Sequence, residues 1–213
     1  MCRILYLERK EKSEVIPVLK AFAKMAQNSR EYQGHGWGCA WWDENHWDFH
    51  WDLRPIWKSS FEAIPPTRRL LVHARSAFRD QGIAIENNMP FVRQNLVFIF
   101  NGELHGVRLK ETGRIGAEKI FNFVLRFYRG NLLGAIQQAI PIIIKKSRYV
   151  RAMNLILASP AETVLVSQFS EQPDYFTMHE LRTSEQVIVC SEPLNLFDSW
   201  QPIANQTVKE IRL

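Results

Sequence analysis

Apolar side chains in the first quarter of the chain follow three different spacings. Residues 2 to 7 form a short, mostly apolar run that predicts a buried strand. Residues 13 to 28 carry apolar side chains close to helical spacing, which predicts a helix. Residues 34 to 51 place two aromatic-rich runs around an Asp-Glu-Asn turn, which predicts a β-hairpin. The chain is therefore expected to begin with a strand, a helix and a hairpin.

Two further strands are predicted before the middle of the chain, at Leu70 to Ser76 and at Asn95 to Phe100. The second is expected to end at Asn101-Gly102, because this dipeptide suits a tight turn. The first of these strands contains Arg75 near its end, and the second leads into Asn101.

Two consecutive helices are predicted next, over residues 115 to 128 and 131 to 143. Pro141 is expected to disturb the end of the second helix, because proline lacks the backbone N–H that a helix interior needs. The remaining apolar runs predict strands and lie at residues 155–157, 163–168 and 186–189.

Strands, a helix pair and more strands predict an α+β fold, in which antiparallel sheets pack against helices. No linker, repeat or low-complexity tract interrupts the 213 residues, so we expect one domain over residues 1–213. No apolar run reaches the length needed to cross a bilayer, and the first residues do not resemble a secretory signal. A cytoplasmic protein without a membrane partner is the expectation.

Charge adds little to this picture. Lys and Arg number 27 and Asp and Glu 22, a net charge of +5 that is spread along the chain. Such a diffuse excess does not predict a nucleic-acid partner. His46 and His50 lie among Asp43, Glu44 and Asp48, but their spacing matches no zinc motif, so neither a metal nor a cofactor is expected.

Cys2 is the candidate nucleophile. The chain has three cysteines, too few for a disulfide framework, and one follows the first methionine directly. If Met1 is removed, the new α-amine lies beside the thiol, and an α-amine has a pKa of about 7.7–8.0. A large fraction is then neutral at physiological pH and can take the thiol proton. From position alone, a small buried side chain of the first strand is the favoured interpretation of Cys2.

Four further segments make the catalytic interpretation more specific, because they resemble the type 2, N-terminal-cysteine glutamine amidotransferase domain in its stand-alone bacterial form. They occur in the family's order: Gly36-Trp37-Gly38-Cys39-Ala40-Trp41, Val72-His73-Ala74-Arg75-Ser76-Ala77, Glu86-Asn87-Asn88-Met89-Pro90-Phe91 with Phe98-Ile99-Phe100-Asn101-Gly102-Glu103-Leu104, and Cys190-Ser191-Glu192-Pro193-Leu194. The resemblance implies a four-layer αββα sandwich of the N-terminal-nucleophile hydrolase type.

The resemblance also implies roles for individual residues. Asn101 and Gly102 match the pair that forms the family's oxyanion hole. Arg75 matches the arginine that grips the substrate's α-carboxylate, a task that suits a guanidinium fork. The remaining matches belong to the expected substrate-binding surroundings, as a structural histidine and a wall of the pocket, and are His73, Trp37 and Gly38.

The sequence departs from the family where the substrate's ammonium is bound. The family carries Asp at the start of the first long helix, and this chain has Gly116. Two outcomes stay open: the substrate is an amide without a free amine, or an acid such as Glu118 or Glu103 supplies the charge. Other departures are polar family positions occupied by His35, Met89 and Phe100.

These observations predict an amidohydrolase that cleaves the side-chain amide of glutamine or a γ-glutamyl compound through a Cys2 thioester. The expected partner is therefore a small amide, and a separate subunit that accepts ammonia is a further alternative. A catalytically degenerate binding or partner subunit is the competing interpretation.

Overall fold

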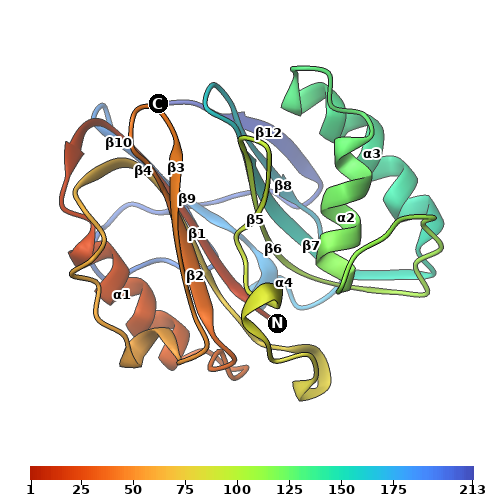
Figure 1. The fold of residues 1–213 in the computed structure, drawn as a ribbon, viewed down its shortest axis with the longest axis horizontal. Helices are drawn as coiled ribbons and strands as arrows, with labels where there is room; N and C mark the ends of the chain where they lie inside the picture. The colour runs from red at the N-terminus through yellow and green to blue at the C-terminus, as the bar shows by residue number, and fades with distance from the viewer.

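The computed structural model describes residues 1–213 and contains two antiparallel sheets and four α-helices. The sheets lie face to face, and helices cover the outer face of each (Figure 1). No helix is both long and apolar enough to cross a membrane. The structure confirms the predicted α+β class and its αββα layering.

The larger sheet has seven strands in the order β11-β9-β10-β1-β4-β2-β3. Their bounds are β1 Arg3–Ser13, β2 Trp37–Trp42, β3 Trp47–Asp52, β4 Thr67–Ala74, β9 His179–Arg182, β10 Gln186–Cys190 and β11 Gln201–Pro202. β1 lies at the centre, between a strand of the first half of the chain and one near its end. Its position therefore depends on both halves.

The smaller sheet has five strands in the order β12-β8-β7-β6-β5. Their bounds are β5 Phe91–Arg93, β6 Leu96–His105, β7 Tyr149–Ala158, β8 Thr163–Ser167 and β12 Thr207–Ile211. The sequence did not predict the short strands β5, β9 and β11, or β12, because none has a long apolar run.

One helix packs on the larger sheet and two pack on the smaller one (Figure 1). The helices are α1 Ile16–Gln27, α2 Gly116–Leu125, α3 Leu132–Lys146 and the single-turn α4 Pro173–Phe176, and three 3-10 turns occur at Ile56–Lys58, Phe78–Asp80 and Ile85–Asn87. The prediction for Pro141 was wrong, because α3 continues through it for five residues. Apolar burial of this helix outweighs the one missing N–H.

Alternation along β1 assigns its two faces. Ile4 and Tyr6 are buried in the cluster that fills the space between the sheets. Leu5 and Leu7 are buried on the other face, in the cluster formed with α1. Side chains of a strand alternate between faces, so Cys2 lies on the same side as Ile4.

Arg69 joins the two sheets at the end of the sandwich away from Cys2. Its side chain is buried, and its guanidinium donates to the Ser159 carbonyl (2.9 Å), the Pro160 carbonyl (2.8 Å) and Thr163 Oγ1 (2.8 Å). Tyr6 extends this network, because Thr163 donates to its hydroxyl at 3.0 Å. A buried guanidinium is tolerated when its donors are matched in this way.

Replacing Arg69 with Met should lower the free energy of unfolding by about 3 kcal/mol, because it leaves the buried Ser159 carbonyl, the Thr163 hydroxyl and the Pro160 carbonyl without their donor. Urea unfolding measures the change. Arg68 is the matched control, because its side chain is exposed and makes only a long hydrogen bond to the Arg9 carbonyl. Arg68→Met should change the free energy of unfolding by less than about 0.5 kcal/mol. Equal losses in the two variants would show that the hydrogen bonds of Arg69 do not stabilise the protein.

Candidate functional site

Cys2 lies just before β1, beside the end of β4. Arg3 pairs with Ala74 in the antiparallel register, so Cys2 lies level with Arg75. The thiol donates to the Ser76 carbonyl, with a sulfur–oxygen distance of 3.6 Å. Burial raises the pKa of the Cys2 thiol, while the nearby Met1 ammonium and Arg75 act in the opposite direction.

Arg75 is a buried cation without an acid partner. It is 4% exposed, and its guanidinium donates to the Gly82 carbonyl at 2.8 Å and to Asn88 Oδ1 at 3.4 Å. No carboxylate lies within salt-bridge distance of it, and burial lowers its pKa. A buried, unpaired guanidinium beside a thiol suits a carboxylate ligand.

Two glycines of the aromatic hairpin leave room for the segment that contains Asn88, a hydrogen-bond partner of Arg75. Gly36 has φ +106°, and a Cβ there would lie 2.2 Å from Asn88 Nδ2. A Cβ at Gly38 would lie 2.5 Å from the Met89 carbonyl oxygen. Gly38 therefore acts through packing, by leaving room for the chain that carries Asn88.

Asn101 has a buried side-chain amide with no hydrogen-bond partner. It lies on β6 opposite Asn154 of β7, and both residues are fully buried. Asn154 donates to the Phe176 carbonyl at 2.7 Å and accepts from the Gln168 N–H at 3.1 Å. Neither the oxygen nor the nitrogen of the Asn101 amide has such a partner. Buried amides are rarely left unpaired, so the Asn101 amide is available to a ligand.

Gly102 does not lie in a turn, so that part of the sequence prediction was wrong. β6 continues through it to His105, and Gly102 pairs with Met153 in the middle of the sheet. A Cβ at Gly102 would lie 2.4 Å from both the Ala152 carbonyl oxygen and the Phe100 ring. The glycine is required by this close approach, which the dipeptide pattern alone could not distinguish from a turn.

His73 faces the space between the sheets, opposite Ile4 of β1 and Gly38 of β2. Burial lowers its pKa to about 3, with Arg75 adding to the effect and the Phe100 carbonyl opposing it. Neither ring nitrogen completes a hydrogen bond of ordinary geometry. His73 is therefore neutral near pH 7 and cannot supply a charge to a ligand.

Trp37 does not come to this site. It packs in the cluster between the larger sheet and α1, and its indole N–H donates to Ser59 Oγ at 2.9 Å. Its strand partner Ala74 lies in the same cluster, on the face opposite His73. The aromatic run correctly predicted a strand, but it did not indicate on which face of the sheet Trp37 would lie.

Arg3 is a site residue that the sequence did not reveal. It is 1% exposed, forms an ion pair with Glu192 and donates to the Tyr175 carbonyl (3.2 Å) and Ser29 Oγ (3.0 Å). Ser191, next to Glu192, accepts from the Ile4 N–H at 2.9 Å. The late Ser-Glu-Pro-Leu motif thus holds the strand that presents Cys2, a long-range pairing without a local signal.

Acids proposed for a substrate ammonium are already paired. Glu118 is buried between Arg93 and Arg114, and hydrogen bonds from Arg114 hold its pKa at about 2. Glu103 pairs with Arg151 at 2.9 Å and with His105 at 2.7 Å. Neither carboxylate is free for a ligand.

Glu31 is the acid next to Cys2, and the sequence analysis missed it. It lies in the loop after α1, pairs with the Met1 ammonium and lies 3.8 Å from Arg151. Nothing in the local sequence distinguishes it from an ordinary surface glutamate.

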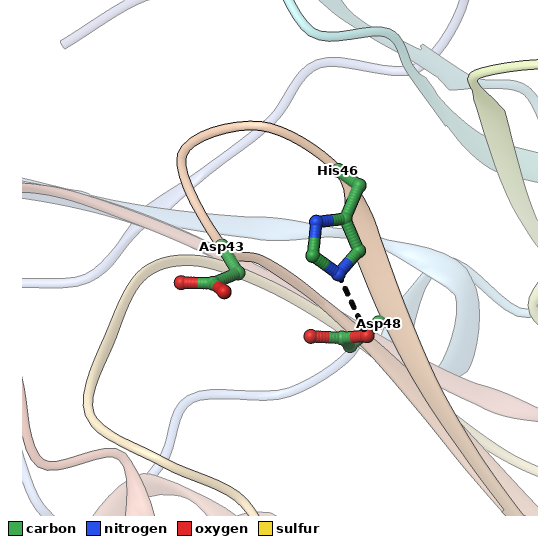
Figure 2. Close-up of side chains that lie close together, drawn as sticks. All are labelled: Asp43, His46 and Asp48. Atoms are coloured by element: carbon green, nitrogen blue, oxygen red, sulfur yellow. Dashed lines mark hydrogen bonds and ion pairs between the residues drawn. The ribbon is translucent and has the colours of Figure 1, made fainter.

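The acidic hairpin tip groups three residues that could bind a metal. Figure 2 shows the His46 ring directed at Asp48, with Nε2 3.1 Å from Oδ1, and Asp43 across the turn. Lys12 already pairs with Asp43 and Glu44. Asp43 and His46 lie at the surface in the turn between β2 and β3, and Asp48 lies near the start of β3; none of these side chains contacts Cys2.

No family model matches the chain, and no curated protein matches it. Solved structures do match. Glutamine phosphoribosylpyrophosphate amidotransferase from Bacillus subtilis, complexed with ADP and GMP, has a TM-score of 0.64 at 15% identity over 89% of this chain. This chain spans 42% of that enzyme's length.

Two shorter proteins match over nearly their whole length. A glutamine aminotransferase class-II domain protein from Silicibacter pomeroyi has a TM-score of 0.64 at 15% identity, over 99% of this chain and 98% of the other. A predicted glutamine amidotransferase from Pseudomonas aeruginosa has a TM-score of 0.62 at 14% identity, over 98% and 96%. The chain therefore has the fold of class-II glutamine amidotransferase domains, as the sequence motifs predicted.

The two facing asparagines generate a stability prediction. Asn154→Ala should lower the free energy of unfolding by about 2 kcal/mol, because it leaves the Phe176 carbonyl and the Gln168 N–H unpaired. Asn101→Ala should cost less than about 1 kcal/mol, because it removes an amide that has no partner to lose. Urea unfolding of both variants measures the difference. Equal losses would show that the Asn101 amide is hydrogen-bonded in the protein.

Proposed function

We propose that this protein is an amidohydrolase of the glutaminase type, which cleaves a side-chain amide through a thioester on Cys2. The observation that carries the proposal is the combination of a buried Arg75 without an acid partner, which lies level with Cys2 beside the end of β4, and a buried Asn101 amide without a hydrogen bond on β6 of the facing sheet. An acyl substrate that carries a carboxylate would satisfy both groups.

The proposed reaction requires Cys2 to become the first residue by removal of Met1. Its α-amine then takes the thiol proton, and the sulfur attacks the amide carbon of a substrate whose carboxylate is held by Arg75. The Asn101 amide and the Gly102 N–H donate to the oxyanion. The amine leaves with the proton, and water hydrolyses the thioester, again with the Cys2 amine as base.

His73 supports this arrangement without taking part in proton transfer. A pKa of about 3 keeps its ring neutral, so it adds no second positive charge beside Arg75 and does not weaken the Cys2 base. Because no acid lies within salt-bridge distance of Arg75, the proposed substrate presents a carboxylate to its guanidinium. This expectation does not depend on which group is attached to the substrate's amine.

Mass spectrometry of the native protein tests the nucleophile. Met1 should be absent, and a glutamine-like electrophile should add once, on Cys2. Cys39 and Cys190 should stay unlabelled in the folded protein, because both are fully buried and burial raises the pKa of Cys190 to about 12. Retained Met1 without an adduct would instead favour a non-catalytic partner subunit on the same fold.

Kinetics with γ-glutamyl-p-nitroanilide separate the proposed roles. Cys2→Ala should abolish turnover, and Asn101→Ala should lower kcat roughly 10²–10³-fold while leaving stability nearly unchanged. Arg75→Lys should raise KM roughly 10-fold, because an ammonium cannot match a carboxylate with two parallel bonds. Unchanged turnover in Cys2→Ala would refute the thioester mechanism.

A further inference from the structure

Met1 fills a pocket next to the thiol. Its side chain is 7% exposed. The pocket consists of one small and three aromatic side chains: Ala152, Phe169, Tyr175 and Phe176. The Met1 carbonyl accepts from Gln33 Nε2 at 2.6 Å and from the Tyr175 hydroxyl at 3.1 Å, and the Met1 ammonium pairs with Glu31. We call these surroundings the Met1 pocket.

Removal of Met1 takes a partner from three kinds of group. The Glu31 carboxylate loses the ammonium and keeps Arg151 at 3.8 Å, and the apolar hollow loses the Met1 side chain. The Tyr175 hydroxyl and Gln33 Nε2 lose the Met1 carbonyl, while Gln33 Nε2 still donates to the Glu31 carbonyl at 2.8 Å. Gln33 is fully buried, and its Oε1 already has no hydrogen-bond partner. Since desolvated polar groups and empty apolar hollows both cost free energy, the vacated pocket suits a ligand that combines a cation, an apolar chain and an acceptor.

We propose that the Met1 pocket binds the amine leaving group of the substrate, a primary amine that carries a carbonyl and an apolar chain of about the length of a methionine side chain. This inference rests on the function proposed above and names the substrate class: γ-glutamyl amides of such amines, in preference to glutamine.

The positions of the two charged anchors assign the pocket to the leaving group. Arg75 donates to Gly82 and Asn88, whereas Glu31 pairs with Met1 and lies 3.8 Å from Arg151. The two anchors share no partner, and Glu31 already holds an amine that is joined to a carbonyl and an apolar chain. The proposal therefore places the carboxylate of the γ-glutamyl group at Arg75 and the amine of the leaving group at Glu31.

The chemical step is balanced by groups of this site. The Cys2 amine takes the thiol proton, the sulfur–carbon bond forms, and the carbon–nitrogen bond of the amide breaks. The leaving nitrogen receives the proton from the Cys2 ammonium and departs as a neutral amine. It then binds a second proton from water, and the resulting ammonium pairs with Glu31.

Binding can be measured without turnover. The Cys2→Ala protein, shown by mass to lack Met1, is titrated with L-methioninamide in a calorimeter. A Kd of about 1 mM or below is expected, and Glu31→Gln should weaken it at least 10-fold. N-acetyl-L-methioninamide, which lacks the cation, should bind at least 10-fold more weakly to the unsubstituted Glu31 protein.

Glu171→Gln is the matched control, because Glu171 also pairs with Arg151, at 2.7 Å, but does not contact Met1. It should change the Kd less than twofold. No heat of binding at about 10 mM ligand, or equal binding to Glu31→Gln, would overturn the proposal.

Turnover by the wild-type protein tests the assignment to the leaving group. The kcat/KM for γ-glutamyl-L-methioninamide should exceed that for L-glutamine at least 10-fold, and Glu31→Gln should remove this preference. A preference for glutamine would overturn the assignment. If neither compound is hydrolysed, the proposed function fails, and the calorimetric result still decides whether the pocket binds the amine.

Discussion

The pairing of the buried Arg3 guanidinium fixes the place of the thiol. A guanidinium this deeply buried is tolerated only with complete pairing, and its partners come from the loop after α1, from α4 and from the segment after β10. A shift of β1 by one residue would break all of these contacts and would turn Cys2 to the other face of the sheet. The local position of one side chain is thus determined by three distant segments.

The buried polar groups around Arg69 and those around Cys2 differ in how completely they are hydrogen-bonded. At the Arg69 end, the guanidinium donors, two carbonyls and two hydroxyls satisfy one another. At the Cys2 end, the Asn101 amide, the Gln33 Oε1 atom and the ring of His73 lack partners, and Arg75 lacks an acid. Unpaired groups cost stability, which the apolar core between the sheets offsets. Such a concentration of unmet hydrogen-bonding capacity is typical of a binding site.

Much of this architecture was readable from the sequence, because regular strands and helices carry periodic apolar patterns. The first strand, the first helix and the aromatic hairpin appear where the pattern indicated, as does the pair α2 and α3. Motif order led to the correct fold. Sequence spacing could not show that Gly102 lies in mid-strand or that Trp37 faces α1, because both depend on which backbone passes nearby.

Residues that act through distant partners escaped prediction altogether. Glu31 and Gln33 lie in an irregular loop, and their roles depend on contacts with a chain terminus 30 residues or more away. Arg3 depends on Glu192, which is 189 residues distant. The motif that contains Glu192 was recognisable, but its physical task became apparent only when the ends of the chain met in space.

The wall that encloses Met1 has a consequence for the order of events during synthesis. Tyr175, which contacts the Met1 carbonyl, is 174 residues away along the chain. At roughly 5–20 residues per second, a ribosome needs on the order of 10 to 30 s to add it. An aminopeptidase can reach Met1 during this interval, whereas in the finished fold its side chain is 7% exposed and its ammonium pairs with Glu31. Under the proposed mechanism, exposure of the Cys2 amine is therefore a matter of timing, because a chain that folds before Met1 is removed keeps the Met1 pocket filled.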